Sequence, residues 1–214
     1  MGVKVFSADK LFMRRLIYIP IIHGEIDMGS LADRLKEEYI AKFGEEKWRE
    51  YLNVADELWN DIGVRLERLN LDYKKVKLFQ DGLPKSGKEM DIVRELAEKG
   101  SANYKLLLEL IEKGAQLIGT EDPQLLIKEY NHVKDIVKPV PEGSNRGETG
   151  IEDGRERLEK YREIGALLLS ERDGYIARRI NESLEQGETA VLFIGIAHKV
   201  DKKLPEDIKV EYLS

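Results

Sequence analysis

The sequence predicts an α/β fold, a single domain with a parallel or mixed central sheet of about four to six strands flanked by helices. Short apolar runs rich in β-branched and aromatic residues are typical of buried strands, and they lie at 15–22, 76–79, 115–118 and 189–194. Helical patterns separate these runs, and each connection is long enough for a crossover between parallel strands. The 214 residues suffice for one such domain, 1–214, with a full core.

Two helices are expected between the first two strands. Ser30, with Asp33 three residues later, has the pattern of a capping box and begins a helix that ends near Phe43. The next helix carries apolar residues at intervals of three and four, which form one stripe: Trp48, Tyr51, Leu52, Ala55, Leu58, Trp59, Ile62, Leu66 and Leu69. Such a stripe packs on a core, so we interpret both tryptophans as core residues.

Three further helices are predicted between residues 86 and 137. Ser86 with Glu89 begins the third, and a fourth covers residues 102–113 after Gly100 and Ser101. Asp122 before Pro123 is a favourable N-cap and begins a fifth, which ends near Val137 because Pro139 cannot continue it.

The last third of the chain begins with an irregular stretch. Residues 138–150 are rich in Pro, Gly and Ser, so they form a loop that either closes over the site as a lid or only connects surface elements. A charged helical region follows over 151–186, with Gly165 and Gly174 as candidate breaks. Residues 208–213 alternate apolar and charged side chains, which is typical of an edge strand.

Composition limits the function classes. With 42% hydrophobic and 36% charged residues the chain is globular, and its many Glu, Lys and Arg are typical of proteins from hot environments. The net charge of −6 without a basic stripe argues against nucleic acid as a partner. The absence of Cys excludes disulfides and thiolate chemistry. We find no signal-peptide pattern and no apolar stretch of membrane-spanning length, so we expect a cytoplasmic protein without a membrane partner. The oligomeric state stays open.

Polar side chains follow each of the first four predicted strands. If those strands are parallel, their carboxyl ends meet at one rim, where ligands and catalytic groups collect in α/β sheets. The groups expected there are His23, Glu25 and Asp27 after the first strand, Asp81 after the second, Glu121 after the third and His198 after the fourth. His132 lies within a helical pattern and is left out of the site.

Two chemistries suit this rim. His23, Glu121 and His198 could bind a divalent metal such as Zn, Mn or Fe, because imidazole nitrogens and carboxylate oxygens suit these ions. Alternatively, His or Glu acts as a general base on water without a metal. Arg172, in the late helical region, is expected to hold a substrate anion or to stabilise developing negative charge. Each of these polar residues also has a purely structural interpretation. Asp122 would be a helix cap, Asp81 a turn residue, Arg172 part of a salt-bridged helix surface, and the histidines hydrogen-bonded structural residues.

Several common signatures are missing: the dinucleotide and phosphate loops, the nucleophile elbow GxSxG, and HExxH. The motifs that are present are the Glu-Arg-Asp group at 171–173, the late strand ending in Gly-x-x-His at 195–198, and the His-Gly-Glu group at 23–25. Together they resemble the superfamily of erythromycin-esterase-like, ChaN-like and TraB/TIKI proteins, although the early His and Glu stand in the reverse of that family's order. The resemblance implies an α/β fold with its site at the strand ends. It also implies an activity among ester or peptide hydrolases, some of them metal-dependent, or haem binding.

The leading hypothesis is a hydrolase, dependent on a divalent metal, that acts on a small ester, amide or phosphate. His23 and His198 bind the metal or act as base and acid, Glu25 and Glu121 are ligands or orient an imidazole, and Arg172 binds the substrate anion. Asp27 and Asp81 are secondary candidates. The alternative is a non-catalytic protein that binds a metal, haem or a small metabolite in the same crevice. A third reading gives the histidines only a structural role.

Overall fold

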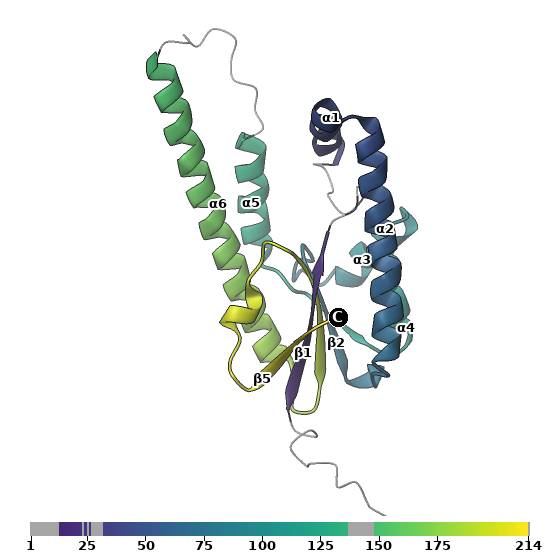
Figure 1. The fold of residues 1–214 in the computed structure, drawn as a ribbon. Helices are drawn as coiled ribbons and strands as arrows, with labels where there is room; N and C mark the ends of the chain where they lie inside the picture. Colours follow the sequence, from purple (N-terminus) through teal and green to yellow (C-terminus); the bar gives the residue numbers. More distant parts are fainter. Residues whose placement is uncertain (1–12, 23, 25, 27–31, 137–147, 214) are drawn as a thin grey trace, which may run out of the picture.

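Five parallel strands form the sheet of the computed structural model, which describes residues 13–22, 24, 26, 32–136 and 148–213 (Figure 1). The strands are β1 (Arg14–Ile21), β2 (Val76–Gln80), β3 (Gln116–Ile118), β4 (Thr189–Gly195) and β5 (Ile208–Tyr212). Their spatial order is β3-β2-β4-β1-β5, and each neighbouring pair is parallel. The predicted α/β class and the positions of all five strands are therefore confirmed.

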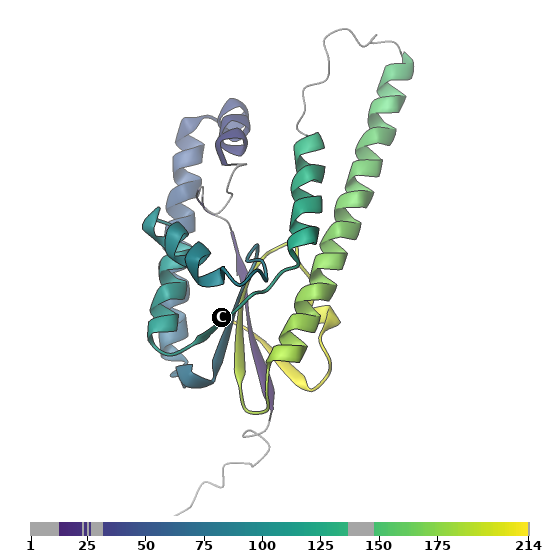
Figure 2. The ribbon, with the colours of Figure 1, turned by 180° about the vertical axis from the view of Figure 1, so that it is seen from behind.

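Helices cover both faces of the sheet (Figures 1 and 2). They are α1 (Ala32–Phe43), α2 (Glu45–Arg68), α3 (Glu89–Glu98), α4 (Ala102–Glu112), α5 (Pro123–Ile136) and α6 (Glu148–Ser183). One core cluster joins the sheet to α2, α3 and α4, and the other joins it to α6. Alternate residues of β4 belong to the two clusters. Val191 and Phe193 belong to the first, and Leu192 and Ile194 belong to the second. This is the pattern of a strand buried on both faces.

The predicted stripe on α2 is largely buried. Trp48, Ala55, Trp59, Ile62 and Leu66 are its buried members. Both tryptophans are core residues, as predicted: Trp59 packs 5.8 Å from the Phe193 ring between centroids, and Trp48 packs against aromatic rings of α1 and α2.

The predicted cap at Asp122 is confirmed, and the predicted helix start at Ser86 is shifted. Ser101 accepts a hydrogen bond from the Tyr104 N–H at the start of α4, and Asp122 accepts from the Gln124 N–H at the start of α5. The third helix begins at Glu89 rather than at Ser86, with Lys88 in the N-cap position. Glu89 Oε1 accepts from the Ser86 and Gly87 N–H groups, so the carboxylate organises the turn ahead of the helix instead of closing a capping box.

The late helical region is continuous. Gly165 and Gly174, expected as candidate breaks, both lie inside α6, which runs for 36 residues. Glycine lowers helix stability by only about 1 kcal/mol, so packing on α5 and on the sheet is enough to keep both residues helical. α6 begins at Glu148, so the end of the predicted loop 138–150 is helical. The rest of that loop, and with it the choice between a lid and a connection, lies outside the described residues, as does Ser30.

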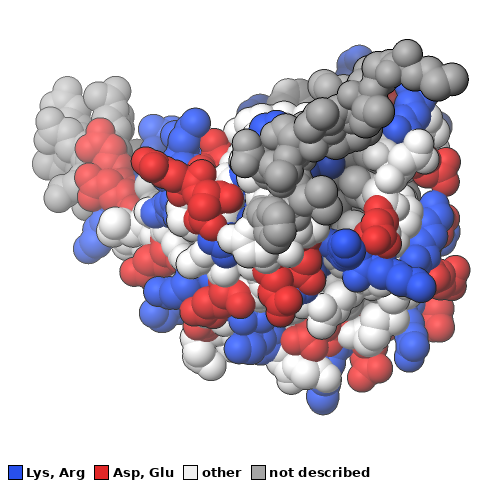
Figure 3. Space-filling model, turned by 90° about the horizontal axis from the view of Figure 1, so that it is seen from below, with Lys and Arg blue, Asp and Glu red and all other residues white. Residues whose placement is uncertain are grey.

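Among the described residues, none of the helices combines the length and apolarity that crossing a membrane requires. Acidic and basic side chains are interspersed on the face seen in Figure 3. No single-sign field dominates this face.

Candidate functional site

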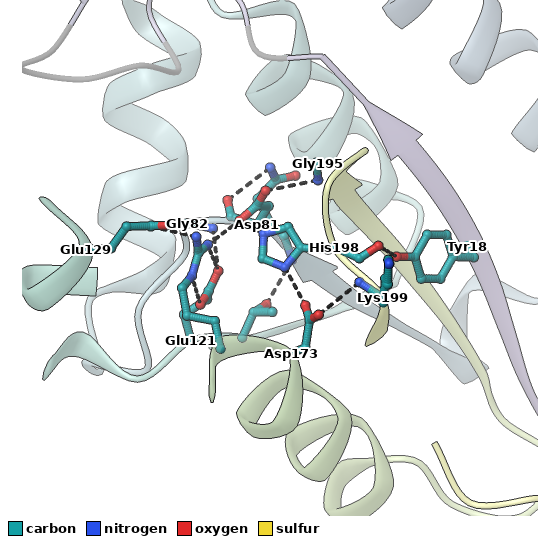
Figure 4. Close-up of polar contacts among 12 residues, drawn as sticks. Tyr18, Asp81, Gly82, Glu121, Glu129, Asp173, Gly195, His198 and Lys199 are labelled. Atoms are coloured by element: carbon teal, nitrogen blue, oxygen red, sulfur yellow. Dashed lines mark hydrogen bonds and ion pairs between the residues drawn. The ribbon is translucent and has the colours of Figure 1, made fainter. Parts of the chain in front are cut away.

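The carboxyl ends of the strands meet at one rim, as the parallel topology requires. Asp81 follows β2, Glu121 lies three residues beyond β3, and His198 lies three residues beyond β4. The structure brings these three predicted residues together with Arg172 of α6 (Figure 4). His23, Glu25 and Asp27, which follow β1, lie outside the described residues.

Arg172 is the centre of a group of carboxylates. Its Nε donates to Glu121 Oε2 at 2.9 Å, its Nη2 donates to Asp81 Oδ1 at 2.6 Å, and its Nη1 donates to Glu129 Oε2 at 2.6 Å. A second bond joins Nη2 to the other Glu121 oxygen. A guanidinium has five N–H groups, so these four bonds leave one. Arg172 therefore holds protein carboxylates, and its expected role of binding a substrate anion stays a prediction.

The loops after β2 and β3 support the carboxylates. The Gln80 N–H donates to Thr120 Oγ1 at 2.8 Å, and the Lys85 N–H donates to the Glu121 carbonyl at 2.8 Å. The Gly82 N–H donates to Glu121 Oε1 at 3.1 Å, so Glu121 has hydrogen-bond donors on both oxygens. Asp81 is neither a simple turn residue nor solvated, because its Oδ2 accepts from the Gly195 N–H at 3.0 Å.

Electrostatics in this group reflect one buried cation among three acids. Burial raises the pKa of the Glu121 carboxyl above its ordinary value, with the Asp81 charge acting in the same direction and Arg172 opposing it. The Glu121, Asp81 and Glu129 carboxylates raise the pKa of Arg172, against the opposing effect of its burial. Arg172 thus stays charged, and burial makes the Glu121 carboxyl easier to protonate.

His198 forms the second half of the site. Its Nδ1 lies 2.6 Å from Asp173 Oδ1, and both side chains are almost fully buried. The Lys199 N–H donates to the other Asp173 oxygen at 2.9 Å, so this carboxylate is held at both ends. A carboxylate can only accept, so Nδ1 carries the hydrogen in this bond and the neutral ring keeps its lone pair on Nε2.

The two halves meet between His198 and Asp81. His198 Nε2 lies 3.6 Å from Asp81 Oδ1, the oxygen that Arg172 also contacts. That separation is longer than a hydrogen bond. The Tyr18 hydroxyl donates to the His198 carbonyl at 3.2 Å, which ties the histidine backbone to β1. The site therefore combines a buried Asp–His pair with an arginine–carboxylate group (Figure 4).

The described residues do not by themselves make a metal site. Within them there is no group of three or more His, Asp or Glu side chains arranged to hold a metal ion. Both Glu121 oxygens accept bonds from Arg172, and His198 Nδ1 is bonded to Asp173. The expected ligand set of His23, Glu121 and His198 includes a residue outside the described part, so it stays a prediction.

Sequence reasoning missed two members of this site. Asp173 is adjacent to Arg172, and successive helix residues point about 100° apart, so one neighbour faces the carboxylates and the other faces His198. The sequence signal for Asp173 was the Glu-Arg-Asp group at 171–173. Glu129 sits in the second turn of α5 and follows no strand, so nothing in its local sequence marks it. His132, left out of the site, lies on α5 with Nε2 3.0 Å from the Tyr161 carbonyl.

No protein-family model matches the chain, and no significant match was found among curated proteins or among solved structures.

Proposed function

We propose that the chain is a hydrolase that acts on a small ester, amide or phosphate, with His198 as the general base. The observation that supports this most is the His198–Asp173 pair, at 2.6 Å, at the carboxyl end of the central strand. A carboxylate that orients an imidazole and stabilises its protonated form is the arrangement that general-base catalysis needs.

In this proposal His198 Nε2 takes a proton from water as the water oxygen attacks the carbonyl carbon or the phosphorus. The same nitrogen then returns the proton to the leaving group as its bond to that atom breaks. Asp173 keeps the ring oriented through Nδ1 and is a positioning residue. Arg172 holds Asp81, whose Oδ1 lies 3.6 Å from Nε2, so it too is a positioning residue in this mechanism.

The resemblance to erythromycin-esterase-like, ChaN-like and TraB/TIKI proteins favours the same class of reaction. The oxygens of Glu121 and Asp81 already accept hydrogen bonds from Arg172 and from backbone N–H groups. A divalent metal in this site would therefore need His23 as a ligand. The substrate is a small molecule, since the imidazole is only 4% exposed and a large group has little room to approach it.

The test is hydrolysis of p-nitrophenyl acetate, p-nitrophenyl phosphate and an amino-acid p-nitroanilide, each with EDTA, with Mn²⁺ and with Zn²⁺. We expect turnover of at least one substrate by the wild type, and a loss of about a hundredfold or more in kcat for His198→Gln and Asp173→Asn. His132→Gln is the matched control, because this histidine lies on α5 outside the site.

Two results would overturn the proposal. One is unchanged turnover in a folded His198→Gln variant, verified by its thermal unfolding. The other is a wild type that hydrolyses none of the three substrates under any condition. A copurifying metal, haem or metabolite in that second case would favour the non-catalytic binding protein.

A further inference from the structure

The outer edge of β5 is a row of backbone groups with which no described strand pairs. β5 lies at one end of the sheet, and β1 is its only neighbour among the described strands (Figure 1). The strand at the opposite end, β3, has three residues, whereas β5 has five. Unpaired edges are templates for pairing with another strand, and proteins commonly protect them by keeping them very short or covered. The β5 edge is therefore a candidate interaction surface.

Alternate residues of β5 direct their backbone groups toward this edge. The Leu213 N–H donates to the Tyr18 carbonyl of β1 at 3.1 Å. Successive residues of a strand direct their N–H and C=O groups to opposite sides, so those of Ile208, Val210 and Tyr212 point away from β1. These three even-numbered residues are the ones through which the edge can bind another strand.

The side chains of β5 divide between the two faces of the sheet. Ile208 and Val210 pack into the core cluster that joins the sheet to α6, and Tyr212, on the same face, is 55% exposed. Lys209 and Glu211 lie on the other face, where Lys209 Nζ is 2.7 Å from Glu211 Oε1. The edge strand thus carries one cation and one anion, two residues apart on the same face.

The register that gives two antiparallel β5 strands full overlap also brings opposite charges together. With Val210 opposite Val210 of a second copy, Lys209 of each copy lies opposite Glu211 of the other. These are non-hydrogen-bonded positions, where opposing side chains come closest. The next register in either direction places Lys209 opposite Lys209 or Glu211 opposite Glu211, and like charges directly opposite are destabilising. The charge pattern of β5 is therefore complementary to itself in the centred register.

We propose that β5 pairs with β5 of a second copy across a two-fold axis, so that the two sheets become one continuous sheet. A two-fold axis makes the strands antiparallel and uses the same edge of both copies. The Val210 N–H of each copy donates to the Val210 carbonyl of the other, and the Tyr212 N–H donates to the Ile208 carbonyl. The Ile208 N–H takes no part, because it donates to the Pro205 carbonyl of its own chain at 3.1 Å.

The size of the interface sets the expected affinity. A typical stable interface buries about 1,600 Å², and one pair of five-residue strands supplies less than this. We therefore expect a dissociation constant of about 1–100 µM. No side chain of the candidate functional site takes part, so the dimer stands or falls independently of the proposed hydrolase activity.

Sedimentation equilibrium of the full chain between about 1 and 500 µM measures the association. We expect the wild type to change from monomer to dimer over this range. Lys209→Glu places a carboxylate opposite Glu211 of the second copy, and Glu211→Lys places an ammonium group opposite Lys209. Because the dimer contains each contact twice, either variant alone should associate about tenfold more weakly or worse. Lys105→Glu, which makes the same charge change at an exposed position of α4, is the matched control and should dimerise like the wild type.

An equimolar mixture of the two charge variants is the most specific readout. In a mixed dimer the carboxylates of the Lys209→Glu copy face the ammonium groups of the Glu211→Lys copy. Association should then return to within about threefold of the wild type. Misfolding of either variant would not produce this recovery.

Val210→Pro tests the backbone bonds without a change of charge. It removes an N–H that points away from β1, and proline is tolerated at such edge positions. This variant should therefore keep the fold, verified by thermal unfolding, and lose the dimer. Three results would overturn the proposal: a wild type that stays monomeric up to about 500 µM, a folded Val210→Pro variant that dimerises like the wild type, or folded charge variants whose mixture associates no better than either alone.

Discussion

At the scale of single residues, Arg172 organises three carboxylates that would otherwise repel one another. One guanidinium faces Asp81, Glu121 and Glu129, and two of these acids are fully or nearly fully buried. Removing the cation would leave buried charges uncompensated, which typically costs about 3–5 kcal/mol. The arrangement of the three carboxylates therefore depends on Arg172. The single positive charge of Arg172 does not, however, balance three full negative charges.

The protonation of Glu121 is the first prediction at this scale. Because burial raises its pKa, the folded protein takes up a proton at this carboxyl more readily than the unfolded chain does. The stability that Glu121 contributes is then fully present below its ordinary pKa of 4.5 and is lost as the pH rises through the folded-state value. The free energy of unfolding of the wild type minus that of Glu121→Gln should therefore fall from pH 4.5 to pH 8, by no more than about 1.4 kcal/mol per pH unit.

Urea unfolding at a series of pH values measures this difference. Glu57→Gln, which removes an exposed glutamate on α2, controls for the general effect of losing one carboxyl group. If the wild type instead gains stability relative to Glu121→Gln as the pH rises, then the effect of Arg172 on the pKa of Glu121 outweighs the effect of burial.

Residue chemistry was predictable from the sequence where a strand end marked it. Asp81, Glu121 and His198 each follow a strand, and the structure brings them into one group with Arg172. The role of Arg172 was less predictable, because a helix sequence does not say which side chains a guanidinium will meet. Glu129 had no signal at all, since it reaches the site only through the packing of α5 on α6.

At the scale of the elements, the loop between β3 and α5 requires a glycine. A Cβ on Gly119 would lie 2.6 Å from Glu89 Oε1 and 2.7 Å from Lys85 Cα. The second contact is with backbone, so a side chain there would force the β2–α3 loop away from Thr120 and Glu121. Gly174 of α6 is different, because a Cβ there would meet nothing within 4 Å.

Alanine at the two positions should therefore act in opposite directions. Gly119→Ala should lower the free energy of unfolding by about 1–3 kcal/mol through overpacking. Gly174→Ala should raise it by about 0.5–1 kcal/mol, because alanine is the better helix former. Denaturant unfolding of both variants measures the pair. A Gly119→Ala protein as stable as the wild type would mean that the loop carrying Glu121 does not approach Lys85 this closely.

The elements themselves were largely predictable, since strands and helices here differ in period and in β-branched content. Four strands lie where the apolar runs predicted them, and the fifth lies where residues 208–213 alternate. The differences concern glycine and capping. Local propensity marked Gly165 and Gly174 as candidate breaks and Ser86 as a helix start, but tertiary packing keeps α6 continuous and α3 begins at Glu89. Propensity differences of about 1 kcal/mol are too small to decide against such packing.

At the scale of the whole molecule, β4 is the centre of both the core and the site. It pairs with β1 on one side and β2 on the other, and residues 190–194 are 0–1% exposed. Its carboxyl end carries Gly195, which donates to Asp81, and leads to His198. The sheet edges are different: β3 has three residues, and β5 pairs with β1 alone among the described strands.

Native-state hydrogen exchange should reveal this gradient. Amides of residues 190–194 can exchange only when strands on both sides separate and both core clusters open, so their opening free energy should equal that of global unfolding. Amides of β3 and β5 should exchange through smaller openings, because separating an edge strand breaks one ladder. The measurement is exchange at increasing denaturant below the unfolding transition, with residue resolution by NMR. Edge and centre amides with the same opening free energy would mean that the sheet opens as one cooperative unit, and the site rim would then open only when the whole molecule unfolds.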